Sequence, residues 1–156
     1  MFHNRKQRLP MDAYCVEGSA WHVTINVARA NGQPFVDVEL GQQQMRSFLR
    51  GCDICTAIPH LICVMPDHLH LLVEIRSIGL VDLMRRTKSS STKLWWRQGG
   101  RGQLWLESFH DRGVRDIPDF DAIATYILNN PVEAGLAEDW ESYPLIVGTL
   151  IASRDG

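Results

Sequence analysis

The chain has 156 residues and a net charge of −2, with 45% hydrophobic and 22% charged residues, which is ordinary for one soluble globular domain. No apolar run is long enough to span a bilayer, and the first ten residues lack the apolar core of a signal peptide. The composition therefore excludes a membrane-spanning or exported chain of the usual kind, and we expect a cytoplasmic protein.

The first half of the chain predicts several strands and one helix. Residues 21–28, W-H-V-T-I-N-V-A, alternate and are rich in β-branched and aromatic side chains, which is typical of a strand. Residues 38–51 carry apolar side chains at helical spacing and end at a glycine, which predicts a helix. Three further strands are expected at residues 52–58, 61–65 and 68–75, the last one directly after a Pro-Asp turn.

The second half predicts two helices separated by a short extended segment. The first helix spans residues 80–97, and glycines end it before an extended segment at 103–109. The second spans residues 118–130, because Pro118 suits a first turn and Pro131 limits the end. Tight turns join several of the strands, so we expect an α+β fold in which helices pack on one side of an antiparallel sheet.

The four cysteines include one C-x-x-C pair, Cys52 and Cys55. A structural zinc site would need a second pair of Cys or His at matching spacing, and no such pair is obvious. We therefore expect these cysteines to be reduced and partly buried.

Charge is distributed unevenly along the chain. Residues 85–115 hold eight basic and two acidic residues, a local charge of +6, whereas residues 116–156 hold eight acidic residues and one arginine. This asymmetry fits a local face that binds a polyanion. On charge alone, a solvated helix face is an equally good interpretation.

Two histidines, His68 and His70, stand two positions apart in M-P-D-H-L-H-L-L-V. On a strand both side chains point to the same face, where two imidazoles can bind one divalent metal and leave positions open for a third ligand and a substrate oxygen. Two packed, hydrogen-bonded histidines are the more common explanation of an isolated H-x-H. The turn before the pair and the apolar strand after it favour the metal site.

Tyr126 and Asn130 are four residues apart on a predicted helix and therefore share one face. A phenol and an amide so placed could supply a nucleophile and an oxygen ligand. Spacing alone still favours Tyr126 as a packing aromatic.

Three segments that carry these residues resemble one protein family. V-M-P-D-H-L-H-L-L-V-E (64–74) resembles the histidine-hydrophobe-histidine motif of the single-tyrosine HUH transposases. Residues 102–115 and Y-I-L-N-N-P-V-E-A-G-L (126–136) resemble the signature of their REP-associated branch. The resemblance implies a ferredoxin-like or RRM-like antiparallel sheet with helices packed on one face. It further implies one HUH transposase domain over residues 1–156, of which the first twelve are expected to be flexible.

The resemblance also implies a set of functional residues. His68, His70 and Asn130 match the family's ligands for Mg²⁺ or Mn²⁺, and Tyr126 matches the nucleophile that cleaves and rejoins DNA through a 5′-phosphotyrosine. The implied partner is single-stranded or hairpin DNA, the implied location is the nucleoid, and the protein is expected to be a monomer or a homodimer. The residues expected to contact DNA are Arg85, Arg86, Lys88, Lys93, Arg97, Arg112 and Arg115.

Two other functions stay open on the sequence. A domesticated relative could bind hairpin or REP DNA without cutting it. A small metal-dependent hydrolase could use the histidine pair with an acid such as Asp67 or Glu74, of which Glu74 shares the strand face of His68 but stands far along the strand.

Overall fold

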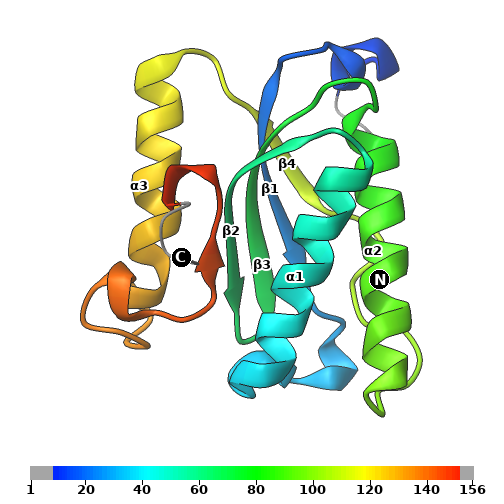
Figure 1. The fold of residues 1–156 in the computed structure, drawn as a ribbon, viewed down its shortest axis with the longest axis vertical. Helices are drawn as coiled ribbons and strands as arrows, with labels where there is room; N and C mark the ends of the chain where they lie inside the picture. The colour runs from blue at the N-terminus through cyan, green and yellow to red at the C-terminus, as the bar shows by residue number, and fades with distance from the viewer. Residues whose placement is uncertain (1–8, 152–156) are drawn as a thin grey trace.

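A computed structural model describes residues 9–151 as a five-stranded antiparallel sheet covered by three α-helices (Figure 1). The strands lie in the order β4-β1-β3-β2-β5, so β3 is the central strand of the sheet. The strands are β1 (Ala20–Asn26), β2 (Ile58–Met65), β3 (His68–Glu74), β4 (His110–Gly113) and β5 (Ile146–Val147). The helices are α1 (Val38–Ile54), α2 (Leu80–Arg97) and α3 (Ile117–Glu133).

The helices form two layers on opposite faces of the sheet. In Figure 1, α1 and α2 lie side by side on one face, and α3 crosses the other. Alternate residues of β1, such as Val23 and Ile25, are fully buried, and the intervening His22 and Thr24 point to the α3 side. The expected α+β fold with an antiparallel sheet is confirmed, and α1 and α2 pack on one face as expected. Helix α3 does not share that face but covers the opposite one, over the polar side of the central strands.

Helix α1 is longer than the sequence predicts. It begins where the Asp37 side chain accepts hydrogen bonds from the backbone N–H groups of Glu39 and Leu40. Gly51 does not end the helix, which continues to Ile54. A Cβ at Gly51 would lie 2.3 Å from Cγ2 of Thr87, so this glycine lets α1 and α2 approach closely. The strand expected at residues 52–58 is therefore wrong, because its first half is the last turn of α1.

Strand β2 runs without interruption through the Pro59–His60 pair that the sequence analysis places between two strands. The pairing with β3 shifts between Pro59 and Leu61, so His60 is the extra residue of a bulge. The bulge accommodates a proline, which cannot donate to the ladder, near the end of the strand.

The C-terminal half also departs from the prediction at several points. The segment 103–109 forms no named strand: Trp105 makes an isolated bridge with Val27, just beyond the end of β1, and the backbone N–H of Leu106 bonds the carbonyl of Asn26. Strand β4 starts only after this segment. Helix α3 continues past Pro131 to Glu133, less than one turn further, and the backbone N–H of Leu136 bonds the Pro131 carbonyl. The two-residue strand β5 was not predicted.

The remaining expectations concern the N-terminus, the cysteines and membranes. Residues 1–8 lie outside the described residues, and Met11–Cys15 forms a short 3₁₀ helix. Cys52 and Cys55 are buried, and all four cysteines are free within residues 9–151. None of the helices in that range is long and apolar enough to cross a bilayer.

Candidate active site

The two histidines of the H-x-H motif lie at the start of the central strand β3, on the face that α3 covers. Their ring centroids are 4.9 Å apart and the ring planes are nearly perpendicular, at 87°. His70 is 3% exposed, whereas His68 is partly exposed at the end of the strand. The strand therefore places both imidazoles on one face, as its alternation predicts.

Both rings are held through their Nδ1 atoms. Nδ1 of His68 lies 2.8 Å from Oδ1 of Asp67, which can only accept when ionised, so Nδ1 carries the hydrogen of a neutral His68. Nδ1 of His70 lies 3.1 Å from Nε2 of His22 and 3.3 Å from Oγ1 of Thr24, both on β1. Nε2 of His70 is buried and makes no hydrogen bond of good geometry to any residue in the described part of the chain.

The environment keeps the buried imidazoles neutral. Burial, followed by the neighbouring His68 and His22, lowers the pKa of His70 to about 3, and the Asn130 side chain acts in the opposite direction. Burial and the nearby Arg112 lower the pKa of His22 to about 4. A neutral imidazole keeps a lone pair, which is the form that binds a metal.

Helix α3 brings Tyr126 and Asn130 over the same histidines. The Tyr126 ring lies 5.7 Å from the His70 ring at 87°, and 5.9 Å from the His22 ring, measured between centroids. Tyr126 is 52% exposed, so it is not a core aromatic. Asn130 lies one turn further along α3, close enough to His70 to influence its pKa. One chain thus places all four residues of the expected set together.

The donor set fits a divalent cation. Two imidazoles oriented through Nδ1 and a neighbouring amide offer nitrogen and oxygen ligands to a divalent cation. Nε2 of His70 is buried and makes no well-formed hydrogen bond within residues 9–151, with the Asn130 side chain as a neighbour of the ring, as expected of two ligands of one ion. The described residues contain no group of three or more His, Cys, Asp or Glu side chains that could hold a metal.

An open hollow of about 340 Å³ borders Tyr126, and its lining includes His22, which the sequence did not single out. Arg112, one of the residues expected to contact DNA, also lines it and donates to Asp119 over 2.6 Å. The strand W-H-V-T gave the signal for His22 and Thr24, because alternation puts both on the polar face of an otherwise apolar strand. The full lining consists of His22, Arg112, Asp119, Ala122, Ile123 and Tyr126.

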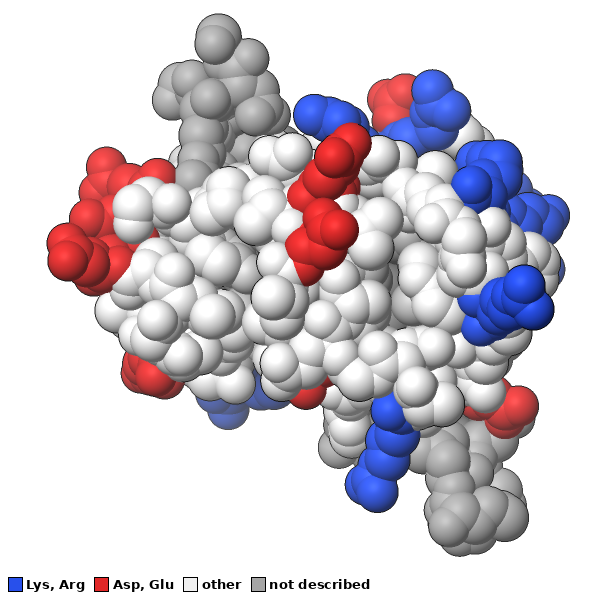
Figure 2. Space-filling view, turned by 90° about the horizontal axis from the view of Figure 1, so that it is seen from below, with Lys and Arg blue, Asp and Glu red and all other residues white. Residues whose placement is uncertain are grey.

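The basic residues expected to contact DNA divide between two regions. Arg112 and Arg115 pair with Asp119 at the start of α3, and Arg112 borders the hollow beside Tyr126. The others lie on α2, across the sheet from Tyr126 (Figure 1). In Figure 2, Lys and Arg gather toward the side where α2 lies, while a group of acidic side chains lies at the opposite end.

The α2 residues are not equivalent. Nζ of Lys88 donates to the backbone carbonyls of Leu106 and Glu107 over 2.7 and 2.8 Å, so this lysine fastens the segment 103–109 to α2. Arg85 pairs with Asp82 on the same helix. The exposed Lys93 borders a groove of about 300 Å³ between α2 and residues 102–105, and the half-exposed Trp96 lines the same groove. Arg86 and Arg97 are also exposed.

Neither acid of the alternative hydrolase is free to act as a third metal ligand in the arrangement described. Asp67 holds Nδ1 of His68. Glu74 lies at the other end of β3, where Arg76 contacts it at 2.8 Å and His60 at 3.3 Å.

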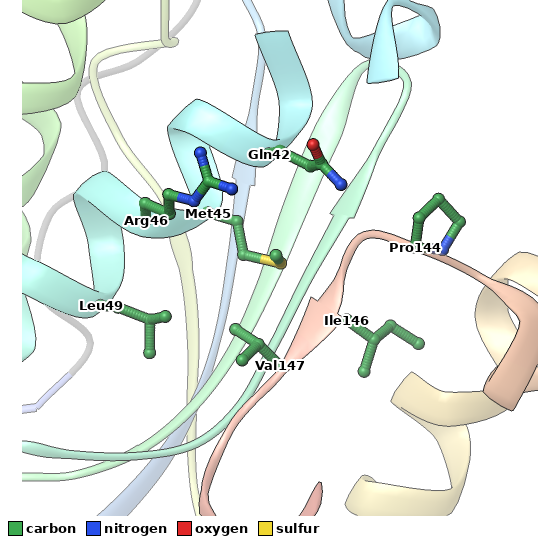
Figure 3. A pocket seen from close by; sticks show the side chains of 7 residues that line it. All are labelled: Gln42, Met45, Arg46, Leu49, Pro144, Ile146 and Val147. Carbon is green, nitrogen blue, oxygen red and sulfur yellow. The ribbon is translucent and has the colours of Figure 1, made fainter. Parts of the chain in front are cut away.

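A further hollow, of about 410 Å³, lies away from these residues between α1 and β5. Side chains of α1, among them Met45 and Arg46, face Ile146 and Val147 across it (Figure 3). None of the residues that the sequence analysis selected lines this hollow.

Comparisons with known proteins agree with this arrangement. The sequence model of the family described as "Transposase IS200 like" matches residues 41–130, and no curated protein matches the chain. A solved structure of a REP-associated tyrosine transposase bound to a REP hairpin is 20% identical, covers 85% of this chain and 78% of its own, and has a TM-score of 0.71. A candidate transposase from Deinococcus radiodurans R1 is also 20% identical, covers 73% and 92%, and has a TM-score of 0.54.

Proposed function

The chain belongs to the family of IS200-like transposases, and from this premise we propose that it is a metal-dependent tyrosine transposase that cleaves and rejoins single-stranded DNA. The family expected from the motifs is thereby confirmed at the level of IS200-like transposases. The observation that carries the proposal is the half-exposed Tyr126 edge-on to the buried His70, in the same chain as His68 and Asn130.

The proposed reaction is a transesterification by Tyr126. The Tyr126 hydroxyl oxygen forms a bond to the phosphorus of a phosphodiester, and the bond from phosphorus to the 3′ oxygen breaks. The tyrosine loses its proton, the freed 3′ oxygen gains one, and the 5′ side stays attached as a phosphotyrosine. A second 3′-hydroxyl then reverses the step and joins a new strand. Each step forms one phosphate ester bond for every one that it breaks, so the reaction needs no nucleotide hydrolysis.

His68, His70 and Asn130 would hold the divalent cation, Mg²⁺ or Mn²⁺. When bound, such a cation supplies a Lewis acid that polarises the phosphate and offsets its developing charge. Asp67 orients the His68 imidazole and His22 orients the His70 imidazole, each through a contact to its Nδ1 atom. His70 is buried and Tyr126 half exposed, so the ligand ring is fixed while the nucleophile stays accessible to DNA.

We propose that the DNA partner carries a hairpin, as in the REP-associated branch. The exposed Lys93 and Arg97 can contact backbone phosphates, and Trp96 beside them offers a ring for an unpaired base. Arg112 borders the hollow at Tyr126 and would contact the phosphates nearest the cleavage point. All four residues of the site lie together in one chain, which supports a tyrosine that acts in cis.

The test is a labelled single strand that contains a REP-like hairpin, incubated with the full chain and Mg²⁺ or Mn²⁺. We expect a covalent protein–DNA adduct that survives denaturing electrophoresis. No adduct should form when EDTA is present from the start, or with Tyr126→Phe. Hairpin binding without an adduct would favour a binding protein instead. A free 5′-phosphate product without an adduct would favour a hydrolase.

A further inference from the structure

His22 is not one of the expected metal ligands, but it lies against both His70 and Tyr126. It lies on β1, diagonally across the β1–β3 ladder from His70, because His22 pairs with Leu72 and Thr24 pairs with His70. Its Nε2 atom is 3.1 Å from Nδ1 of His70, and its ring lies 5.9 Å from the ring of Tyr126. His22 therefore contacts the buried ligand ring and the nucleophile's ring together.

We propose that His22 is a positioning residue that fixes the tautomer of His70 by accepting a hydrogen bond from its Nδ1–H group. This inference rests on the proposed function, because it assigns to His70 the role of metal ligand. A neutral imidazole carries one hydrogen, so a hydrogen on Nδ1 leaves the lone pair on Nε2. Nε2 of His70 is the buried atom that lacks a partner within the described residues.

Two side chains compete for Nδ1 of His70, and distance favours His22. Oγ1 of Thr24 lies at 3.3 Å, slightly further than Nε2 of His22. The Thr24 hydroxyl can donate as well as accept, so alone it would allow either tautomer of His70. An imidazole with its hydrogen on Nδ1 can only accept at Nε2, and it then allows one tautomer. The tautomer of His68 is fixed in the same way by Asp67, whose carboxylate accepts a hydrogen bond from Nδ1.

The first test is a spectrum of the metal-free wild-type protein. Long-range ¹H–¹⁵N correlation distinguishes the protonated from the unprotonated nitrogen of each neutral imidazole. The expected result is a hydrogen on Nδ1 of His70 and none on its Nε2, with a hydrogen on Nδ1 of His22. A hydrogen on Nε2 of His70 overturns the inference whether or not the protein cuts DNA.

The second test measures Mn²⁺ affinity without DNA, by titration calorimetry. His22→Phe keeps a ring but removes the acceptor, and it should bind Mn²⁺ about 10- to 100-fold more weakly than wild type. His22→Gln returns an acceptor to the position of Nε2 and should recover most of this loss. Thr24→Val, the matched control on the same strand, should stay within about threefold of wild type.

The outcomes separate this inference from the proposed function. Wild type that binds Mn²⁺ and forms the adduct, with His22→Phe unchanged or Thr24→Val showing the larger loss, overturns the role of His22 alone. Wild type that forms no adduct overturns the proposed function, while the tautomer of His70 still decides the role of His22. If His22→Phe does not fold, His22→Gln and the wild-type spectrum carry the test.

Discussion

The ring of Tyr126 stands at 87° to the ring of His70, with the two centroids 5.7 Å apart. One ring belongs to the central strand and is 3% exposed, and the other belongs to a helix on the sheet surface and is 52% exposed. A rigid, buried ligand is thereby paired with an accessible nucleophile.

Asn130 should contribute to metal binding. Asn130→Ala removes the amide next to His70, and we expect it to weaken Mn²⁺ binding in calorimetry by about tenfold or more. Asn129 is the matched control, because it is exposed and is the neighbouring residue on the same helix. Equal Mn²⁺ affinities for Asn130→Ala and Asn129→Ala would remove Asn130 from the ligand set.

Lys88 and Lys93 should behave differently although both lie on α2. Lys88→Ala breaks two hydrogen bonds from a partly buried ammonium group to backbone carbonyls, so it should lower the free energy of unfolding in urea by about 1.5–3 kcal/mol. Lys93 is exposed, and Lys93→Ala should leave stability within about 0.5 kcal/mol of wild type.

DNA binding should give the opposite result for Lys93. Lys93→Ala should weaken hairpin binding and reduce by about one the slope of log K against log salt, because one phosphate contact is lost. Glu39→Ala, at an exposed position of α1, provides a surface control. An unchanged salt slope for Lys93→Ala would place the DNA elsewhere than on α2.

Asp119 should make stability depend on pH at the start of α3. A hydrogen bond from the backbone N–H of Arg115 is the main cause that lowers the pKa of Asp119 to about 2, and the Arg112 and Arg115 side chains add to it. The folded-state pKa lies below the ordinary value near 3.9, so the stabilisation is present above about pH 4 and is lost as the pH falls toward 2.

The comparison of wild type with Asp119→Asn checks this linkage. In urea unfolding, the wild type should be the more stable at pH 6, and the difference should shrink strongly at pH 2.5. Asp121→Asn, at an exposed carboxylate in the same helix, serves as control. A difference between wild type and Asp119→Asn that is the same at both pH values would contradict the assignment.

The sequence predicts which side chains share a face better than it predicts where the elements end. Alternation on β3 and the four-residue spacing on α3 are local properties, and they correctly place His68 with His70 and Tyr126 with Asn130. Where α1 ends depends instead on a contact with α2, because Gly51 makes room for Thr87 and therefore does not act as a stop. A glycine in a helix has both uses, and the sequence does not distinguish them.

Local sequence patterns do not predict on which side of the sheet α3 lies. They also do not predict which residues contact the Nδ1 atoms of the two histidines. The proximity of His22 to His70 follows from the register of β1 with β3, which no spacing within β1 reveals. Lys88 was expected to contact DNA because of its charge alone. The two backbone carbonyls that it binds lie almost twenty residues further along the chain, so the sequence gives no sign of them. Periodicity within one element could not link the strand of His68 and His70 to the helix of Tyr126 and Asn130. The resemblance to the REP-associated transposases supplied that link.

The central claim is that the hydroxyl oxygen of Tyr126 forms the covalent bond to DNA. Digestion of the protein–DNA adduct by nuclease and protease, followed by mass spectrometry, locates that bond. The account predicts one nucleotide-bearing peptide, which contains residue 126 and carries the added mass on the tyrosine. An adduct on Tyr14, Tyr143 or any other residue, or a full yield of adduct from Tyr126→Phe, would contradict it.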